Sequence, residues 1–579
     1  MLPRAATFTS DTSSLQKDGP PTPGIKKSFT MRSSVSESHA KTLAAVNSSA
    51  PATPREVNNF QTYLIAVTIC MGAASYGYDT GFFGGTIALD SFIRDFGMDT
   101  MSKSESDEMS ANLVSLFQGG SFFGAALQLP FTQTFGRKWS VVASNIIFIV
   151  SGFMQVFSNG SIPLMMAGRF FGGLAIGISS LVIPVYLSEF APATIRGRLV
   201  GFYDIFIQVG TIFGFWANYI IINTVSSESK FQWQFPVAVQ LFPAGLLLAG
   251  MFFLPETPRF LMMKKKYEEA ESVLSRLRKL PKDHAYIQWE LSQVREQIEY
   301  EESVRGQNTL WDLFRELFRS KDHLKRLGLG LALLFFKTFS GVQAVNYYSP
   351  RIFDQLGFDG QQNKLFATGI YGTVKVVCTL IFGLFIVDRV GRRKPLLIGS
   401  TVGALCMFFI GGYLTGAGPR ADGAERRVGD YFAIIAIFLY AAIYCFGYNS
   451  VPLTLISEIF TMRFRDLSMT FCLMWQWLCT FSIVRIMPVS LTNIEERTYF
   501  VFGSIFICAT PFVYFFIPET KKLPLEAMDH LFGTSQTPHA PDNTSSIAKI
   551  MEKDGAVTQR LEIAQPSLDP ITEQRSRDV

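Results

Sequence analysis

The sequence predicts an all-α membrane protein whose twelve transmembrane helices form two pseudo-symmetric halves of six helices each. Three observations lead to this fold class. The chain of 579 residues has 48% hydrophobic but only 17% charged residues, whereas soluble proteins usually contain about 25% charged residues. The apolar residues gather in stretches of roughly 20, the length of a helix that crosses a bilayer. Three short motifs also recur in the same order along the chain.

The apolar stretches give the helices in order. A backbone N–H or C=O finds no hydrogen-bond partner in lipid, so each stretch must be helical. The predicted spans are 61–84, 111–130, 139–158, 163–186, 200–222, 236–254, 327–349, 365–387, 394–416, 431–456, 467–490 and 499–518.

The remaining segments divide the chain into five parts. Residues 1–58 are rich in Ser, Thr and Pro and lack apolar periodicity, which predicts a disordered tail. A six-helix half over 59–256 follows, and a polar connection over 257–326 contains two amphipathic helical patterns. The second half covers 327–533, and a second disordered tail covers 534–579. Lys and Arg concentrate in the loops after spans 2, 4, 8 and 10, which predicts that these loops, the connection and both termini are cytoplasmic.

The recurring motifs support a duplicated six-helix unit. Gly136-Arg137-Lys138 recurs as Gly391-Arg392-Arg393, Ser188-Glu189-Phe190 as Ser457-Glu458-Ile459, and Pro255-Glu256-Thr257 as Pro518-Glu519-Thr520. Transporters that alternate access by rocking two halves about a central site are built from such repeats.

Opposite charges gather at helix ends on the predicted cytoplasmic side. We expect them to act as a latch, forming ion pairs when this side is closed and losing them when it opens. The alternative is that they only fix the orientation in the membrane, although that role would not need the acidic members. The gate residues are Arg137, Glu189, Arg196, Glu256, Arg392, Glu458, Arg465 and Glu519.

Five charged residues interrupt the apolar spans. Charges inside a membrane are costly, so they usually form pairs and serve a function. Asp79 and Arg169 belong to spans 1 and 4, Asp204 to span 5, and Lys337 and Lys375 to spans 7 and 8.

Several longer motifs resemble the sugar porter family of the major facilitator superfamily over residues 60–533. They are Arg169-Phe170-Phe171-Gly172-Gly173, Pro184-Val185-Tyr186-Leu187-Ser188-Glu189, Asp388-Arg389-Val390-Gly391-Arg392-Arg393 and Pro518-Glu519-Thr520-Lys521. The resemblance implies the major facilitator fold and a sugar-type substrate, and we expect the protein to lie in the plasma membrane. Within the family, the chain is most similar to fungal carriers of the quinate-permease type through Asn346-Tyr347-Tyr348-Ser349-Pro350 and Gly372-Thr373-Val374-Lys375.

The resemblance also assigns roles to individual residues. Asp79 matches the proton-linked aspartate of proton–sugar symporters, and Arg169 matches its partner; the alternative is a static ion pair. Asp204, Lys337 and Gln343 replace amides that usually bind sugar hydroxyls. The other implied substrate contacts are Asn346, Tyr347 and Trp477.

Lys337 has two possible partners. As a cation in the cavity it would suit the carboxylate of a substrate, or it would pair with Asp204 from the other half. The sequence therefore predicts proton-coupled import of a monosaccharide or sugar acid, with galacturonate- or quinate-like substrates favoured. The alternatives are a facilitative carrier of neutral hexoses and a nutrient sensor that does not transport. The chain has no nucleotide-binding loop and no histidine spacing typical of a metal site, so we expect no enzymatic activity, no cofactor and no nucleic-acid partner.

Overall fold

The computed structural model describes residues 54–57, 59–192, 194–305, 310–358, 360–386, 390–418, 427–461 and 463–520. The predicted tail 534–579, and all of the tail 1–58 except residues 54–57, lie outside the described residues. So do Asp388, Arg389 and Lys521 of the family motifs.

Every regular element in these ranges is helical. The first half contains η1 (Arg55–Val57), α2 (Phe60–Ile87), α3 (Asp90–Asp95), α4 (Lys103–Val156), α5 (Ile162–Phe190), α6 (Arg196–Thr224), α7 (Phe231–Val239) and α8 (Leu241–Phe253). The connection contains α9 (Pro258–Met263), α10 (Tyr267–Arg278), α11 (Ala285–Arg305) and α12 (Leu310–Arg319). The second half contains α13 (Lys321–Phe339), α14 (Val342–Gln355), α15 (Gln361–Ile381), η2 (Phe382–Ile386), α17 (Arg393–Ala417), α18 (Val428–Gly447), α19 (Val451–Ile459), α20 (Arg465–Asn493) and α21 (Arg497–Phe516).

The twelve predicted spans are all present as helices. Ten helical segments of the described chain are long and apolar enough to cross a membrane. One of these, α4, has 54 residues and contains both the second and the third predicted spans. The first predicted span is α2, a separate helix of 28 residues.

The backbone breaks at three places along the predicted spans. The first break lies between the second and third spans, as predicted, because Gly136 has a non-helical φ of 88° and ψ of 179° and so divides α4 into two helices. The seventh span is broken at Gly341, whose φ of 98° only glycine adopts easily. The tenth span is broken between α18 and α19, where Pro452 stands in the first turn of α19 and has no N–H to continue the preceding helix.

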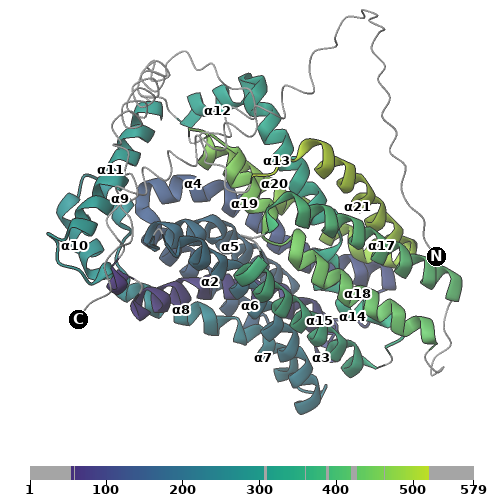
Figure 1. Cartoon of the computed structure of the whole chain (residues 1–579). Helices are drawn as coiled ribbons and strands as arrows, with labels where there is room; N and C mark the ends of the chain where they lie inside the picture. Colours follow the sequence, from purple (N-terminus) through teal and green to yellow (C-terminus); the bar gives the residue numbers. More distant parts are fainter. Residues whose placement is uncertain are drawn as a thin grey trace, which may run out of the picture.

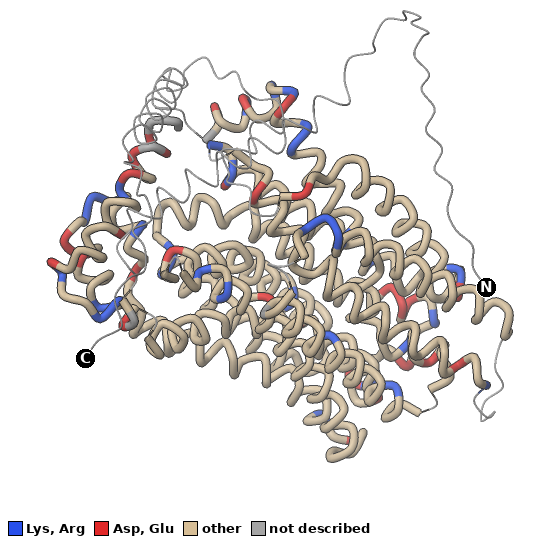
Figure 2. The backbone as a smooth tube through the Cα atoms, in the orientation of Figure 1, with Lys and Arg blue, Asp and Glu red and all other residues tan. Residues whose placement is uncertain are grey.

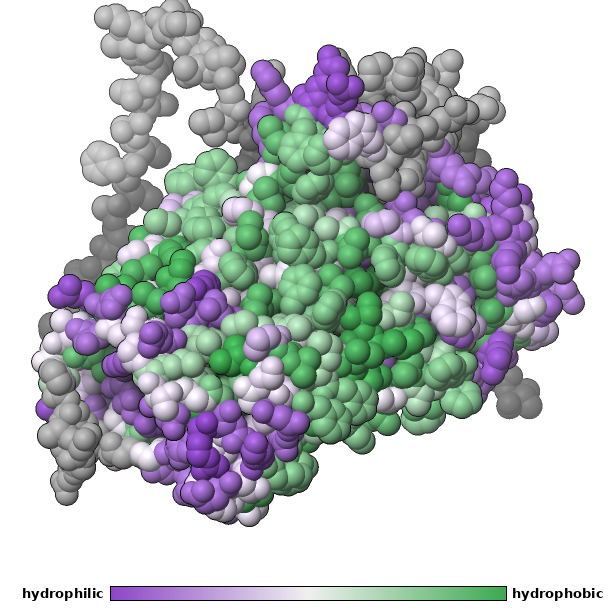
Figure 3. Space-filling view, turned by 180° about the vertical axis from the view of Figure 1, so that it is seen from behind, coloured by the Kyte–Doolittle hydropathy of each residue, from purple (hydrophilic) through white to green (hydrophobic). Residues whose placement is uncertain are grey.

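The two halves lie side by side, and α9, α10 and α11 gather beyond one end of the bundle (Figure 1). We refer to this end, which carries the gate residues, as the predicted cytoplasmic end, and to the other as the predicted outer end. Lys, Arg, Asp and Glu colour mainly the connection and the helix ends (Figure 2). Hydrophobic side chains cover a broad band of the face in Figure 3, with hydrophilic patches on either side of it. This pattern is the one that a bilayer requires of its proteins.

Glycines let helices of the first half touch backbone to backbone. A Cβ added at Gly120 or Gly173 would lie 2.0 or 1.9 Å from a carbonyl oxygen of the facing helix, in the contact between α4 and α5. Gly77 and Gly210 allow the same approach between α2 and α6. Helices in lipid associate largely through such close packing, because the hydrophobic effect does not act between them.

Gly173→Ala should therefore destabilise the folded protein. The new methyl group would meet the Phe117 carbonyl, and such overpacking typically costs about 1–3 kcal/mol. The measurement is the Tm of the purified protein in detergent, which should fall. Gly245→Ala in α8 is the control, since no atom lies within 4 Å of its added Cβ, and its Tm should stay the same or rise. Equal Tm values for the two variants would contradict this packing argument.

Candidate substrate cavity and ion pairs

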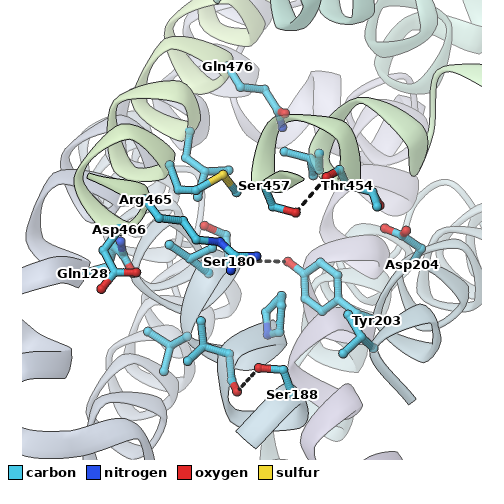
Figure 4. A pocket seen from close by; sticks show the side chains of 18 of the residues that line it. Gln128, Ser180, Ser188, Tyr203, Asp204, Thr454, Ser457, Arg465, Asp466 and Gln476 are labelled. Carbon is cyan, nitrogen blue, oxygen red and sulfur yellow. Dashed lines mark hydrogen bonds between the residues drawn. The ribbon is translucent and has the colours of Figure 1, made fainter. Parts of the chain in front are cut away.

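A cavity of about 550 Å³ lies between the two halves and reaches the predicted cytoplasmic end. Polar side chains of both halves point into it, among them Asp204 and Tyr203 of α6 and Gln476 of α20 (Figure 4). The part formed by the middle of the helices is lined by Tyr76, Thr80, Asp204, Gln208, Lys337, Gln343, Asn346, Lys375, Asn449, Gln476 and Trp477. Gate residues Arg137, Glu189 and Arg465 line the part nearest the predicted cytoplasmic end.

Several buried polar atoms around the cavity are left for a ligand. Gln208 Oε1, Asn449 Nδ2, Gln476 Oε1 and Trp477 Nε1 have no hydrogen-bond partner among the described residues. Gln208 Nε2 donates to Asn449 Oδ1 over 3.3 Å and so joins the two halves. Buried polar groups need partners, so the remaining donors and acceptors fit a ligand that carries hydroxyl groups.

The sequence prediction missed Gln208 and Asn449. Gln208 follows Asp204 by one helical turn and therefore lies on the same face of α6. That spacing is visible in the sequence and could have identified Gln208. Asn449 lies in the break between α18 and α19, and hydropathy did not predict this break.

Five of the six predicted substrate contacts line the cavity, namely Asp204, Lys337, Gln343, Asn346 and Trp477. Tyr347 does not. Its buried hydroxyl accepts a hydrogen bond from Gln118 Nε2 at 2.8 Å and lies 3.5 Å from Thr80 Oγ1. Tyr347 thus joins α14 to α4 and α2, across the boundary between the halves, and its contact with substrate stays a prediction.

Asp204 and Lys337 attract each other across the cavity without forming an ion pair. Each is the charged residue that acts electrostatically on the other, and the described residues include no salt-bridge partner for either. The predicted pairing of the halves through these two residues is therefore a longer-range attraction in this conformation.

Asp79 and Arg169 form an ion pair, and both side chains are completely buried. Arg169 Nε also donates to the Leu113 carbonyl over 3.2 Å, and the rings of Phe83 and Phe117 flank its guanidinium, with centroids 3.7 and 4.6 Å away. Neither charge lines the cavity, but Thr80, the next residue along α2, does. The pair is thus one residue away from the surface that a substrate would touch.

The repeated motifs form the same network in each half. In the first half, Arg137 pairs with Glu189 at 2.9 Å, and Glu256 accepts the backbone N–H groups of Arg137 and Lys138. Thr257 Oγ1 completes the network by donating to Glu189 over 2.6 Å. Burial raises the pKa of Glu256 above its usual value, although these backbone donors counteract part of that effect.

The second half repeats each of these contacts. Arg392 pairs with Glu458 at 3.1 Å, Glu519 accepts the backbone N–H groups of Arg392 and Arg393, and Thr520 Oγ1 donates to Glu458. Gly136 and Gly391 have φ values of 88° and 91°, so even the backbone turns match. These contacts confirm the duplicated unit at atomic detail.

Both ion pairs join helices of one half and are formed although the cavity reaches this end. A latch between the halves therefore needs other partners, and the latch stays a prediction. Arg259, which follows the first half and pairs with Glu301, is also attracted by Asp466 of the second half. The remaining gate residues differ in exposure, since Arg196 is exposed at the start of α6 and Arg465 lines the cavity.

Ion pairs join the halves at the predicted outer end. Asp107 of α4 pairs with Arg351 of α14 and accepts a hydrogen bond from Thr492 of α20. Next to it, Glu108 pairs with Arg485 at 3.1 Å. In this conformation the two halves are thus held together at the outer end, while the cavity reaches the other end.

Comparison with known proteins identifies the family. The family model described as "Sugar (and other) transporter" matches residues 65–532. The chain belongs to the sugar porter family of the major facilitator superfamily. This sugar porter is 38% identical over 513 residues to a probable quinate permease of Aspergillus niger, covering 88% of this chain and 94% of the relative. It is also 38% identical to the quinate permease of Emericella nidulans, covering 84% and 91%.

Solved structures share its fold. The inward open conformation of the xylose transporter XylE from E. coli has a TM-score of 0.66 at 23% identity, covering 81% of this sugar porter and 99% of XylE. The proton:xylose symporter XylE bound to 6-bromo-6-deoxy-D-glucose has a TM-score of 0.67 at 24% identity, covering 81% and 99%. The relatives are permeases and transporters rather than enzymes, and this sugar porter is an integral membrane transporter of the sugar type.

Glu458→Gln should favour conformations that are open at the predicted cytoplasmic end. Arg392 already pairs with Glu458 within the second half in this conformation, so the expected effect requires that Glu458 also attract a basic residue of the first half when this end closes. The measurement is the labelling rate of a cysteine introduced at Ser188, which lines the cavity, and we expect it to rise several-fold. Glu495→Gln, an exposed position at the outer end, is the control. Equal rates for Glu458→Gln and the parent protein would argue against the latch.

Proposed function

We propose that this sugar porter imports a monosaccharide or sugar acid by proton-coupled alternating access, with quinate- or galacturonate-like substrates favoured. The observation that carries the proposal is the buried Asp79–Arg169 pair, one residue away from a cavity with unpartnered polar atoms. The printed names of its relatives, quinate permeases and a proton:xylose symporter, support the same reading.

The cavity supports a polyhydroxylated substrate. Its unpartnered amide and indole groups suit hydroxyls, and Trp477 offers a ring against which a sugar ring packs. The two lysines in the membrane-embedded part of the cavity favour a substrate with a carboxylate over a neutral hexose.

Proton coupling would act through the contact between α2 and α14. A proton on Asp79 removes the negative charge that compensates Arg169 and so weakens the contact between α2 and α5. Asp79 is followed by Thr80, which faces the Tyr347 hydroxyl of α14. Gln343 and Asn346 of the same short helix line the cavity. Protonation and substrate binding would thus both act on α14, the helix whose Arg351 pairs with Asp107 at the outer end.

The orientation follows from the basic loops. With the predicted cytoplasmic end inside the cell, the present conformation is inward-facing, and both termini are cytoplasmic. Substrate then leaves through the cavity described above, while the pairs of Asp107 and Glu108 close the outer end. We place this carrier in the plasma membrane.

Asp79→Asn should abolish uphill accumulation but leave exchange of substrate partly intact, because the variant side chain cannot take up and release a proton. The measurement is accumulation of labelled substrate in proteoliposomes with an imposed pH gradient, beside counterflow without a gradient. Counterflow shows that the variant is folded. Asp107→Asn, which removes a charge at the outer end, should keep the pH dependence. Unchanged pH-driven accumulation in Asp79→Asn would refute the coupling role and favour a facilitative carrier.

Quinate or galacturonate should displace the labelled substrate better than glucose does. The physical reason is that the lysines of the cavity attract a carboxylate that glucose lacks. The measurement is competition against uptake in proteoliposomes. If glucose competes best, the carrier transports neutral sugars. If the protein binds substrate without transporting it, it is a sensor.

A further inference from the structure

Lys375 is a buried cation in the wall of the cavity. It lies on α15, its side chain is almost fully enclosed at 2% exposure, and it lines the cavity. Its Nζ donates to Asn346 Oδ1 over 3.0 Å and lies 5.6 Å from the ring centroid of Tyr371. Both neighbours are uncharged, so they solvate the ammonium group without neutralising it.

The membrane-embedded charges of the cavity do not balance. Asp204 is attracted by Lys337, and no basic residue other than Lys337 acts on it. Among the described residues, Lys375 has no carboxylate partner, whereas Arg169, another fully buried cation, pairs with Asp79. With all groups ionised, Asp204, Lys337 and Lys375 together carry one net positive charge. A buried charge without a counter-charge is costly.

The hydrogen-bonding capacity of Lys375 is also incomplete. An ammonium group has three donors, and one of them is used by Asn346. Asn346 is 5% exposed, lines the same cavity, and its Nδ2 lies 3.4 Å from Gln343 Oε1. A ligand carboxylate beside Lys375 would therefore meet further donors of Lys375 and the amide groups of α14.

We propose that Lys375 binds the carboxylate of the substrate, while Asp204 balances Lys337. The substrate class is then a polyhydroxylated monocarboxylate, whose single negative charge neutralises the cavity. This inference rests on the proposed transport function and assigns a specificity-determining residue to it. From the sequence alone, Lys337 is a candidate for this role, because it replaces an amide of the family pattern, with its pairing with Asp204 as the alternative.

A matched pair of ligands tests the charge alone. Quinate and its methyl ester have the same hydroxylated ring, but the ester is uncharged. The measurement is the Kd of each ligand for the purified full-length protein in detergent, by calorimetry. The parent protein should bind quinate at least tenfold more tightly than methyl quinate. Lys375→Gln should lose that preference by weakening quinate binding at least tenfold, with methyl quinate binding unchanged. Lys375→Arg should keep much of the preference.

The double variant Lys337→Gln with Asp204→Asn is the control, because both residues line the same cavity and removing both charges keeps its one net positive charge. It should leave the ratio of the two affinities nearly unchanged. Loss of the ratio in the double variant but not in Lys375→Gln would overturn the proposal and assign the carboxylate to Lys337. Equal weakening of both ligands in Lys375→Gln would give Lys375 a structural role only, and also overturn it.

Two different outcomes distinguish a wrong proposal about Lys375 from a wrong transport function. If the parent protein transports glucose and shows no preference for quinate over its ester, the proposal about Lys375 is wrong and the transport function stands. If the parent protein transports none of quinate, galacturonate and glucose in proteoliposomes, the proposed function itself fails.

Discussion

The compensation of charge inside the bilayer is the constraint on which the arrangement of this sugar porter depends. Lipid neither solvates an ion nor supplies hydrogen bonds, so each embedded charge needs a partner from another helix or from a ligand. Asp79 and Arg169 meet this requirement completely, with a carbonyl and two aromatic rings adding to the pair. Asp204 and Lys337 meet it in part, over a longer distance. The two sites therefore differ in how charge is compensated: the Asp79–Arg169 pair is neutral within the protein, whereas the cavity keeps a positive charge for which we propose a substrate carboxylate.

The sequence predicts most of the fold, because each helix that crosses the bilayer needs a stretch of about 20 apolar residues, and such stretches are visible in the sequence. All twelve spans are present as helices in two halves, and five of the six residues predicted to contact substrate line the cavity, where their contact with substrate stays a prediction. The helix breaks at Gly341 and before Pro452 were missed, because hydropathy continues across them. The sequence also did not predict that Tyr347 points toward α2 and α4 and away from the cavity. The reason is that the face of α14 that meets α2 depends on how the two halves pack together. That Lys375 has no carboxylate partner among the described residues could not be predicted either, because it depends on how the helices pack around it.

The repeated motifs show what duplication preserves. Glu256 and Glu519 each lie beyond the last helix of their half and accept the backbone N–H groups that follow a kinked glycine. These contacts tie the third helix of each half to its last one, so each half can move as a unit. The lysines and Asp204, by contrast, have no counterpart at the matching place in the other half. The networks at the helix ends are thus the same in both halves, whereas the charged residues of the cavity differ between the halves.

The break at Gly341 has a mechanical consequence. Because α13 and α14 are separate helices, the second can tilt without carrying the first along. This helix of 14 residues has cavity-lining amides near its start, a tyrosine against α2 and an arginine that pairs with Asp107. Its backbone also approaches Gly84 so closely that an added Cβ would lie 1.9 Å from the Tyr347 carbonyl. A second kink, at Tyr348, lies between these amides and Arg351. The first part of α14, which carries the amides and the contacts with α2, can therefore change its tilt while Arg351 keeps its ion pair.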